Sequence, residues 1–310
     1  MSATTTASER NSDRAPTFAP AQWRQVGVIT LAAIGLYAFL RWLPTGTNLS
    51  HMDFRVDAKN AIDFCDPSNP QFIPVVAVAS PVTMKLTAVN AAAGQLVDAQ
   101  VVLATASGKP IATEDLLVVH TRPLHLLIVD ESLQDYQHVH PNPTGRPGEW
   151  AFEFTPKAAG LYRVFADFTP AATQRGLYAL ADLTVASGPR AENPVAAPAD
   201  YRFELTPKAG ALRAGQVIDL QFTISHTAGA AVPLEPVMDA FAHLVAIDEA
   251  RSGFAHLHPA ELDLSKKPDP HRPTLNFKIT IPQAGRYVIW AQVNLGGRET
   301  FVPFWFDVAS

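Results

Sequence analysis

Residues 125–141 read HLLIVDESLQDYQHVHP, and residues 243–259 read HLVAIDEARSGFAHLHP. The two stretches align without a gap at an offset of 118 residues, and both run from a histidine through an apolar stretch and an Asp-Glu pair to His-x-His-Pro. Two further motifs recur in the same order, Ala93-Gly94-Gln95 as Ala214-Gly215-Gln216, and Ala159-Gly160-x-Tyr162 as Ala284-Gly285-x-Tyr287. The sequence therefore predicts an internal duplication.

Each repeat has the pattern of a β-sandwich. Short runs of β-forming residues are separated by Pro, Gly, Asn and Asp clusters. The Ala-Gly-x-Tyr step is like the tyrosine corner of immunoglobulin-like domains, where the phenol bonds back to the backbone. We expect an all-β fold with two tandem immunoglobulin-like β-sandwich domains, 72–187 and 201–310, and a linker at 188–200. Residues 44–71 match nothing in the second repeat and are expected to form a spacer or an added edge segment.

The amino terminus combines a polar leader with an apolar run. Residues 1–24 are expected to form a disordered cytoplasmic tail, and residues 25–43 a single transmembrane helix. Arg10, Arg14 and Arg24 precede the apolar run, so the positive-inside rule places the tail in the cytoplasm. The domains then lie in a bacterial periplasm, anchored to the inner membrane. A cleaved signal peptide is the alternative.

Composition excludes several classes of protein. The 310 residues carry 24 Lys plus Arg against 29 Asp plus Glu, a net charge of −5, which is not the footprint of a nucleic-acid binder. The single cysteine, Cys65, allows no internal disulfide and no two-cysteine metal site, and we expect it to be a buried or incidental thiol. The sequence has no glycine-rich phosphate loop, Gly-x-Ser-x-Gly elbow or His-Glu-x-x-His helix. Neither a nucleotide nor a haem cofactor is expected.

Histidines are the candidate chemical groups, because six of the ten occupy equivalent places in the repeats. Side chains alternate along a strand, so the two histidines of each His-x-His project to the same side. If 124–129 pairs antiparallel with 136–140 and Val129 faces Tyr136, then the first histidine of the repeat faces the last. Three imidazoles would thus converge in each repeat: His125, His138 and His140, and their copies His243, His256 and His258.

Three neutral imidazoles on adjoining strands suit Zn²⁺ or Cu²⁺. His120 and Met238 align with each other a few residues upstream and are candidate fourth ligands, the methionine favouring Cu⁺. Because ligands must be neutral, we expect metal to be lost as the pH falls through the imidazole range near 6.5.

Two other interpretations remain open. Under the same register Leu127, Val129 and Tyr136 share the histidine face, so that face could be core, with histidines bonded to each other or to buried carbonyls. An open position on a three-histidine metal could instead activate water, as in carbonic anhydrases, which the site resembles in geometry alone. No partnering general base is identifiable in the sequence.

The block from His125 through Pro141, with the Phe-rich strand and the Ala-Gly-x-Tyr step that follow, resembles YtkA-like domains. Those are small secreted or membrane-anchored β-sandwiches, often associated with copper and other heavy metals in bacterial envelopes. The resemblance covers one core stretch per repeat and touches the six repeated histidines. It implies a periplasmic, metal-associated role. The long leader, the tandem arrangement and the 44–71 insert depart from the simple pattern.

We therefore expect a single-pass, non-enzymatic envelope protein that binds copper or zinc through one histidine triad per domain and buffers or delivers it. The rival hypothesis is an accessory or scaffold subunit of a larger respiratory or photosynthetic membrane complex, in which the histidines are structural. The expected partners are the lipid bilayer, through residues 25–43, and, under the rival hypothesis, other subunits of that complex.

Overall fold

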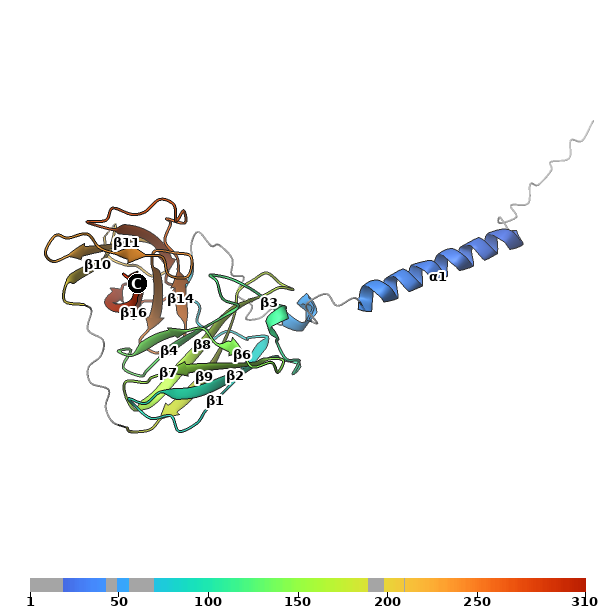
Figure 1. Ribbon diagram of the computed structural model, residues 1–310, viewed down its shortest axis with the longest axis horizontal. Coiled ribbons are helices and arrows are strands. Elements are labelled where there is room, and N and C mark those ends of the chain that lie inside the picture. Colours follow the sequence, from blue (N-terminus) through green and yellow to red (C-terminus); the bar gives the residue numbers. More distant parts are fainter. Residues whose placement is uncertain (1–18, 43–48, 56–69, 189–197, 209) are drawn as a thin grey trace, which may run out of the picture. The chain divides into compact units, whose positions relative to one another are not determined.

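The computed structural model describes residues 19–42, 49–55, 70–188, 198–208 and 210–310 (Figure 1). The chain divides into two compact units, Met1–Thr45 and Gly46–Ser310. The first contains the helix α1, and the second contains every strand that the structure describes. Cys65, residues 1–18 of the expected tail and residues 189–197 of the expected linker lie outside the described residues.

The N-terminal helix α1 spans Pro20–Trp42. Its large apolar side chains are exposed, and the stretch Pro20–Leu40 has a mean hydropathy of 1.4. At 1.5 Å per residue its 23 residues reach about 34 Å, enough to cross a hydrocarbon core of about 30 Å. By length and composition, α1 could cross a membrane, as either a membrane anchor or a signal sequence does. It begins before the expected start at Gln25, because proline is well suited to a first helical turn, so the prediction of a disordered tail is wrong for residues 20–24.

The first sandwich packs a four-stranded antiparallel sheet, in the order β1–β2–β7–β6, against a five-stranded one, in the order β3–β8–β4–β5 with β9 also paired to β8. Inward and outward residues alternate along β2, as expected for a sheet with one buried face. The four-stranded sheet consists of β1 (Val82–Ala88), β2 (Val97–Thr105), β6 (Asn142–Pro143) and β7 (Glu149–Phe154). The five-stranded sheet consists of β3 (Leu116–Leu117), β4 (Leu124–Val129), β5 (Tyr136–Val139), β8 (Gly160–Pro170) and β9 (Leu177–Val185).

The second sandwich repeats this plan with a three-stranded sheet, β10–β11–β15, against a five-stranded sheet, β12–β16–β13–β14 with β17 also paired to β16. The strands are β10 (Tyr201–Pro207), β11 (Val217–His226), β12 (Leu234–Glu235), β13 (His243–Asp248), β14 (Phe254–Leu257), β15 (Thr274–Thr280), β16 (Gly285–Leu295) and β17 (Arg298–Val308). Each sandwich encloses its own apolar core. The prediction of two tandem all-β domains is confirmed.

Both tyrosine corners form as the motif predicts. The Tyr287 hydroxyl donates to the Gln283 carbonyl at 3.0 Å. The Tyr162 hydroxyl accepts the Ala158 N–H at 3.1 Å and donates to Asp135 Oδ2 at 2.8 Å. In each repeat the tyrosine hydroxyl therefore bonds to the backbone four residues earlier, just before the strand begins.

Segments before the first strand join both sandwiches. The 3₁₀ turn η1 (His51–Phe54) buries Phe54 in the first core, and η2 (Thr113–Asp115) is the other 3₁₀ turn described. Phe72 and Ile73 instead pair with Thr280 and Phe254 of the second sandwich. The expected start of the first domain at residue 72 therefore differs from the structure, in which β1 begins at Val82. Phe72 and Ile73 are apolar, as residues of a first strand would be. The sequence pattern does not show which of the two sandwiches such a segment joins.

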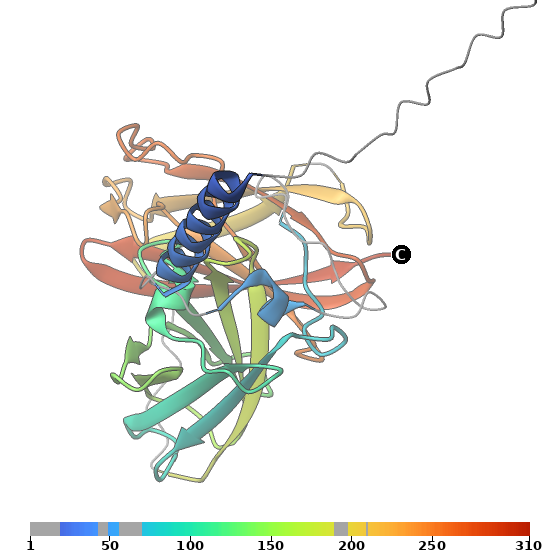
Figure 2. The ribbon, with the colours of Figure 1, turned by 90° about the vertical axis from the view of Figure 1, so that its right-hand side faces the viewer.

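The two five-stranded sheets pack against each other through their outer faces (Figures 1 and 2). Both faces of β4 and of β13 are therefore buried, one in the strand's own sandwich and one at this joint. The joint contains the following buried apolar residues: Ile73, Val75, Leu127, Val129, Leu133, Tyr136, Phe165, Val245, Ile247, Phe254, Val288 and Trp290.

The joint has approximate two-fold symmetry, because equivalent positions of the repeats exchange contacts. Tyr136 stacks on Trp290 with ring centroids 5.6 Å apart, and the equivalent residues Phe254 and Phe165 lie 5.3 Å apart. A duplicated surface that packs on its own copy is self-complementary, like the interface of a symmetric dimer. The residues that the sequence left open as core do form an apolar cluster, which is shared between the two sandwiches.

Candidate metal site

The structure brings together both groups of histidines that the sequence aligned. The strand register is the expected one, with Leu127 opposite His138 in the first repeat and Val245 opposite His256 in the second. In each group one ring nitrogen per histidine lies within 4.8 Å of the others. We call the two groups triad 1 (His125, His138 and His140) and triad 2 (His243, His256 and His258).

The hydrogen bonds around triad 1 fix where its protons lie. Gln292 donates through Nε2 to Glu299 Oε2 at 2.9 Å, so its Oε1 is the atom that faces His138 Nδ1, also at 2.9 Å. His138 therefore carries its proton on Nδ1. His125 donates from Nε2 to the Val119 carbonyl at 2.9 Å, so its proton is on Nε2. In the neutral state each imidazole has one N–H, which leaves lone pairs on His138 Nε2 and His125 Nδ1.

These two lone pairs face each other at 3.1 Å, and His140 Nε2 lies 3.1 Å from the same His125 nitrogen. Two acceptors at this distance repel unless a cation lies between them. Nitrogens bound tetrahedrally to one metal at 2.0–2.1 Å lie about 3.3 Å apart, close to the two separations that involve His125 Nδ1. The three nitrogens of triad 1 could therefore hold a metal ion.

Triad 2 repeats the arrangement. His243 donates from Nε2 to the Val237 carbonyl at 3.0 Å, and His256 Nδ1 lies 3.1 Å from Asp167 Oδ2. The remaining nitrogens, His243 Nδ1, His256 Nε2 and His258 Nε2, are buried without a hydrogen-bond partner among the described residues. Unpartnered buried polar atoms destabilise a fold by about 1–3 kcal/mol each. Three of them that converge fit a metal ion.

Burial keeps the triads neutral. It is the main reason that the pKa of His140 falls to about 3 and that of His243 to about 4. Burial also lowers the pKa of His125, and it lowers those of His138, His256 and His258 well below the ordinary value. Neutral imidazoles are the form that binds metal. Protons compete less for these nitrogens, so metal loss is expected below the pH of 6.5 inferred from the sequence.

His120 lies against the triad of the other repeat. Its ring stacks on His258 with centroids 3.7 Å apart, whereas its centroid is 6.4 Å from that of His125. His120 and Thr121 both have positive φ, of 50° and 70°, in a tight turn that joins Val119 to the next strand. Left-handed backbone is rare for residues other than glycine and clusters at functional sites. A stacked ring contacts its neighbour through its face, so His120 supports His258 from across the joint.

Met238 and Asp239 form the equivalent left-handed turn, with φ of 48° and 60°. Met238 is partly buried, and its backbone lies beside His243. The histidines outside the triads lie elsewhere in the fold: His51 is in η1, His226 ends β11, and His271 is in an exposed loop.

Sequence reasoning missed two residues that contact the triads. Asp167 and Gln292 are register partners of His125 and His243, yet their side chains reach histidines of the opposite repeat. Each lies five residues after the corner tyrosine of its own repeat. The duplication therefore marks both positions, but strand pairing inside one repeat gives no sign that they cross the joint.

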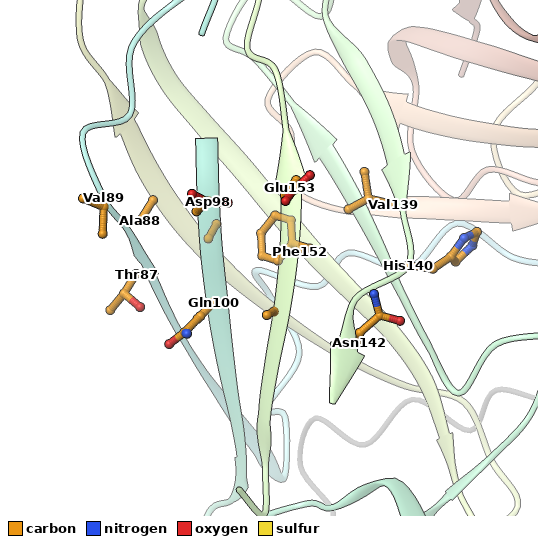
Figure 3. Close-up of a pocket in the computed structure, with 12 residues that line it drawn as sticks. Thr87, Ala88, Val89, Asp98, Gln100, Val139, His140, Asn142, Phe152 and Glu153 are labelled. Carbon is orange, nitrogen blue, oxygen red and sulfur yellow. The ribbon is translucent and has the colours of Figure 1, made fainter. Parts of the chain in front are cut away.

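A pocket of about 620 Å³ lies beside triad 1 and is lined by His140, Val139 and Asn142 together with residues of β1, β2 and β7 (Figure 3). Figure 3 shows Asp98 and Glu153 further along its wall. His140 is therefore the member of triad 1 that borders this hollow, while His138 is buried at the joint.

The fold and the site define a tandem β-sandwich protein with one histidine triad per repeat at the joint between the sandwiches. A family model described as a domain of unknown function, DUF8832, matches residues 77–185 and again residues 196–310. The chain belongs to this family, and the two matches coincide with the two repeats. No curated protein matches the chain.

Solved structures that match this chain include two bacterial adhesins. The Escherichia coli adhesin FdeC is 16% identical over 73% of this chain and 64% of its own, with a TM-score of 0.23. The Yersinia pseudotuberculosis adhesin InvE is 10% identical over 77% and 60%, with a TM-score of 0.22. Red sea bream transglutaminase is 7% identical over 75% and 32%, with a TM-score of 0.25. The chain thus spans less than two thirds of these proteins, and scores this low carry no functional information.

Proposed function

We propose that this protein binds copper or zinc, one ion in each triad, and that it buffers or delivers the metal. The observation that carries the proposal is the pair of lone pairs on His125 Nδ1 and His138 Nε2, which face each other at 3.1 Å. The partner hydrogen bonds fix both protons on the opposite ring nitrogens, and burial disfavours a second proton on either ring. A metal cation satisfies all these groups at once.

The ligand chemistry favours borderline metals. Imidazole suits Zn²⁺ and Cu²⁺, whereas Ca²⁺ and Mg²⁺ prefer oxygen ligands. Three protein ligands leave a position on the metal for exchange with water or with another protein. Such an open position is what a protein that hands metal on requires.

We infer binding rather than catalysis. A general base within reach speeds the loss of a proton from metal-bound water. Asp167, the carboxylate that contacts triad 2, accepts a hydrogen bond from His256 and is engaged by it. The triads also lie at a buried joint, where His125, His138 and His243 are each less than one tenth exposed.

We propose that α1 holds the sandwiches at a bacterial inner membrane, on the periplasmic side. Support comes from the length and hydropathy of Pro20–Leu40 and from the arginines Arg10, Arg14 and Arg24 before it. The resemblance to YtkA-like domains supports the same compartment.

Metal content of the full chain, purified in detergent without chelator, tests the proposed function. We expect about two equivalents of copper or zinc by mass spectrometry, one for each triad. The variant His138→Ala, His140→Ala, His256→Ala, His258→Ala should contain none while its circular dichroism remains that of a β protein. A control variant, His226→Ala with His271→Ala, should keep the full content. A metal-free parent would refute the proposal, and so would metal retained by the quadruple variant.

A further inference from the structure

The two triads differ in the group that contacts their middle histidine, His138 in triad 1 and His256 in triad 2. In triad 2, His256 Nδ1 lies 3.1 Å from Asp167 Oδ2, a direct contact with a carboxylate. In triad 1, His138 Nδ1 lies 2.9 Å from the amide oxygen of Gln292, and the carboxylate of Glu299 lies behind that amide at 2.9 Å from Gln292 Nε2. In triad 2 the central histidine therefore contacts a carboxylate directly. In triad 1 an amide side chain lies between the central histidine and the carboxylate.

Each supporting group comes from the opposite sandwich. Asp167 lies on β8 of the first repeat and supports a ring on β14 of the second, while Gln292 lies on β16 of the second and supports a ring on β5 of the first. Asp167 and Gln292 are equivalent positions of the duplication, as are His138 and His256. The swapped pairs follow the approximate two-fold symmetry of the joint. Each triad therefore gains its supporting group only when the sandwiches are docked.

The difference between carboxylate and amide matters because the joint is buried. His256 is 6% exposed and Asp167 19% exposed in their side chains. A hydrogen bond from a ligating histidine to a carboxylate fixes the tautomer, orients the ring and increases the basicity of the nitrogen that binds metal. The negative charge also offsets the charge of the ion where little water screens it.

We propose that the two metal sites are unequal, with Asp167 and Gln292 as cross-repeat positioning residues that make triad 2 the tighter site for a divalent cation and triad 1 the weaker one. This inference rests on the proposed function. It assigns the stable retention of metal to triad 2. Exchange belongs to triad 1, whose His140 borders the open pocket.

Titration of the full chain with Zn²⁺ in detergent, in competition with a chromophoric chelator, tests this inequality. Asp167→Asn keeps the shape of the side chain and removes its charge. We expect it to weaken the tighter step by about 10- to 100-fold and the other step by less, because Asp167 also lies beside His125 of triad 1. His140→Gln should abolish the weaker step alone, and Asp167→Asn in that background should weaken the step that remains. Glu204→Gln, which changes an exposed carboxylate on β10 away from both triads and the pocket, is the matched control and should change neither step.

A second variant should strengthen metal binding at triad 1 instead of weakening it at triad 2. Gln292→Glu with Glu299→Gln exchanges the two side chains, which keeps their mutual hydrogen bond and places the carboxylate on His138. We expect the weaker step to tighten, so that the two steps approach each other. This variant decides the question if circular dichroism shows that Asp167→Asn does not fold, because a weaker step that fails to tighten overturns the proposal.

The outcomes separate this inference from the proposed function. A parent that binds no zinc would refute the function itself. Two equal steps in the parent would overturn the inference alone, as would loss of the tighter step in His140→Gln or an unchanged tighter step in folded Asp167→Asn. A purely structural role for Asp167 would lower the stability of the fold and leave the ratio of the two binding constants as it is in the parent.

Discussion

We expect acid to lower the free energy of unfolding of the metal-free protein. The contribution of His243 alone is large enough to measure. Burial lowers the pKa of His243 from 6.5 to about 4. Between these values the unfolded chain binds more protons than the folded one, so the free energy of unfolding falls as the pH drops below 6.5 and levels off near 4. At 1.36 kcal/mol for each pKa unit, His243 removes about 2 kcal/mol between pH 7 and pH 5. The other triad histidines, whose pKa values are also lowered, act in the same direction.

Urea unfolding of the full chain in detergent and chelator, followed by circular dichroism at pH 7 and pH 5, measures this loss. His243→Asn should reduce the difference between the two pH values by about 2 kcal/mol. The control His271→Asn changes an exposed loop histidine and should leave the difference as it is in the parent. A parent whose unfolding free energy is the same or greater at pH 5 would show that the triad histidines already carry protons in the folded state, and would refute the assignment of neutral imidazoles.

Three other expectations follow from the joint, the sites and the helix. Phe165→Ala removes a fully buried ring that packs on Phe254 and should lower the unfolding free energy by about 3–5 kcal/mol in urea, whereas a loss below about 1 kcal/mol would mean a loose joint. Zinc at a hundredfold excess over its Kd should raise the unfolding free energy by about 2.7 kcal/mol, seen as a higher Tm at pH 6 that the quadruple histidine variant lacks. Deletion of residues 1–45 should move the expressed chain from the membrane to the soluble cell fraction, and a full chain found in the soluble fraction would contradict the anchor.

The strand register within each repeat could be predicted from the sequence. The turn between Val129 and Tyr136 has the same length in both repeats, and one residue of slip would turn His138 to the opposite face. The convergence of each triad follows from that register. The tyrosine corners were predictable for the same reason, since Ala-Gly-x-Tyr is a local signal.

The position of the triads relative to each other could not be predicted. β4 is apolar on both faces, and a strand buried in its own core has the same sequence pattern as one buried against a second sandwich. The roles of Asp167 and Gln292 depend on that joint and were missed with it. The turn at His120 was missed because positive φ at both central residues ordinarily calls for Asn or Gly, and the sequence has His-Thr there.

X-ray absorption spectroscopy of the zinc-loaded full chain tests the central claim most directly, because it counts the ligands at the metal. The account predicts three imidazole nitrogens per zinc at about 2.0–2.1 Å, with the fourth position taken by a light atom from solvent. The same spectrum should persist in the control variant His226→Ala with His271→Ala. A sulfur ligand, or a shell of oxygen ligands without multiple imidazole scattering, would contradict the assignment of the metal to the triads.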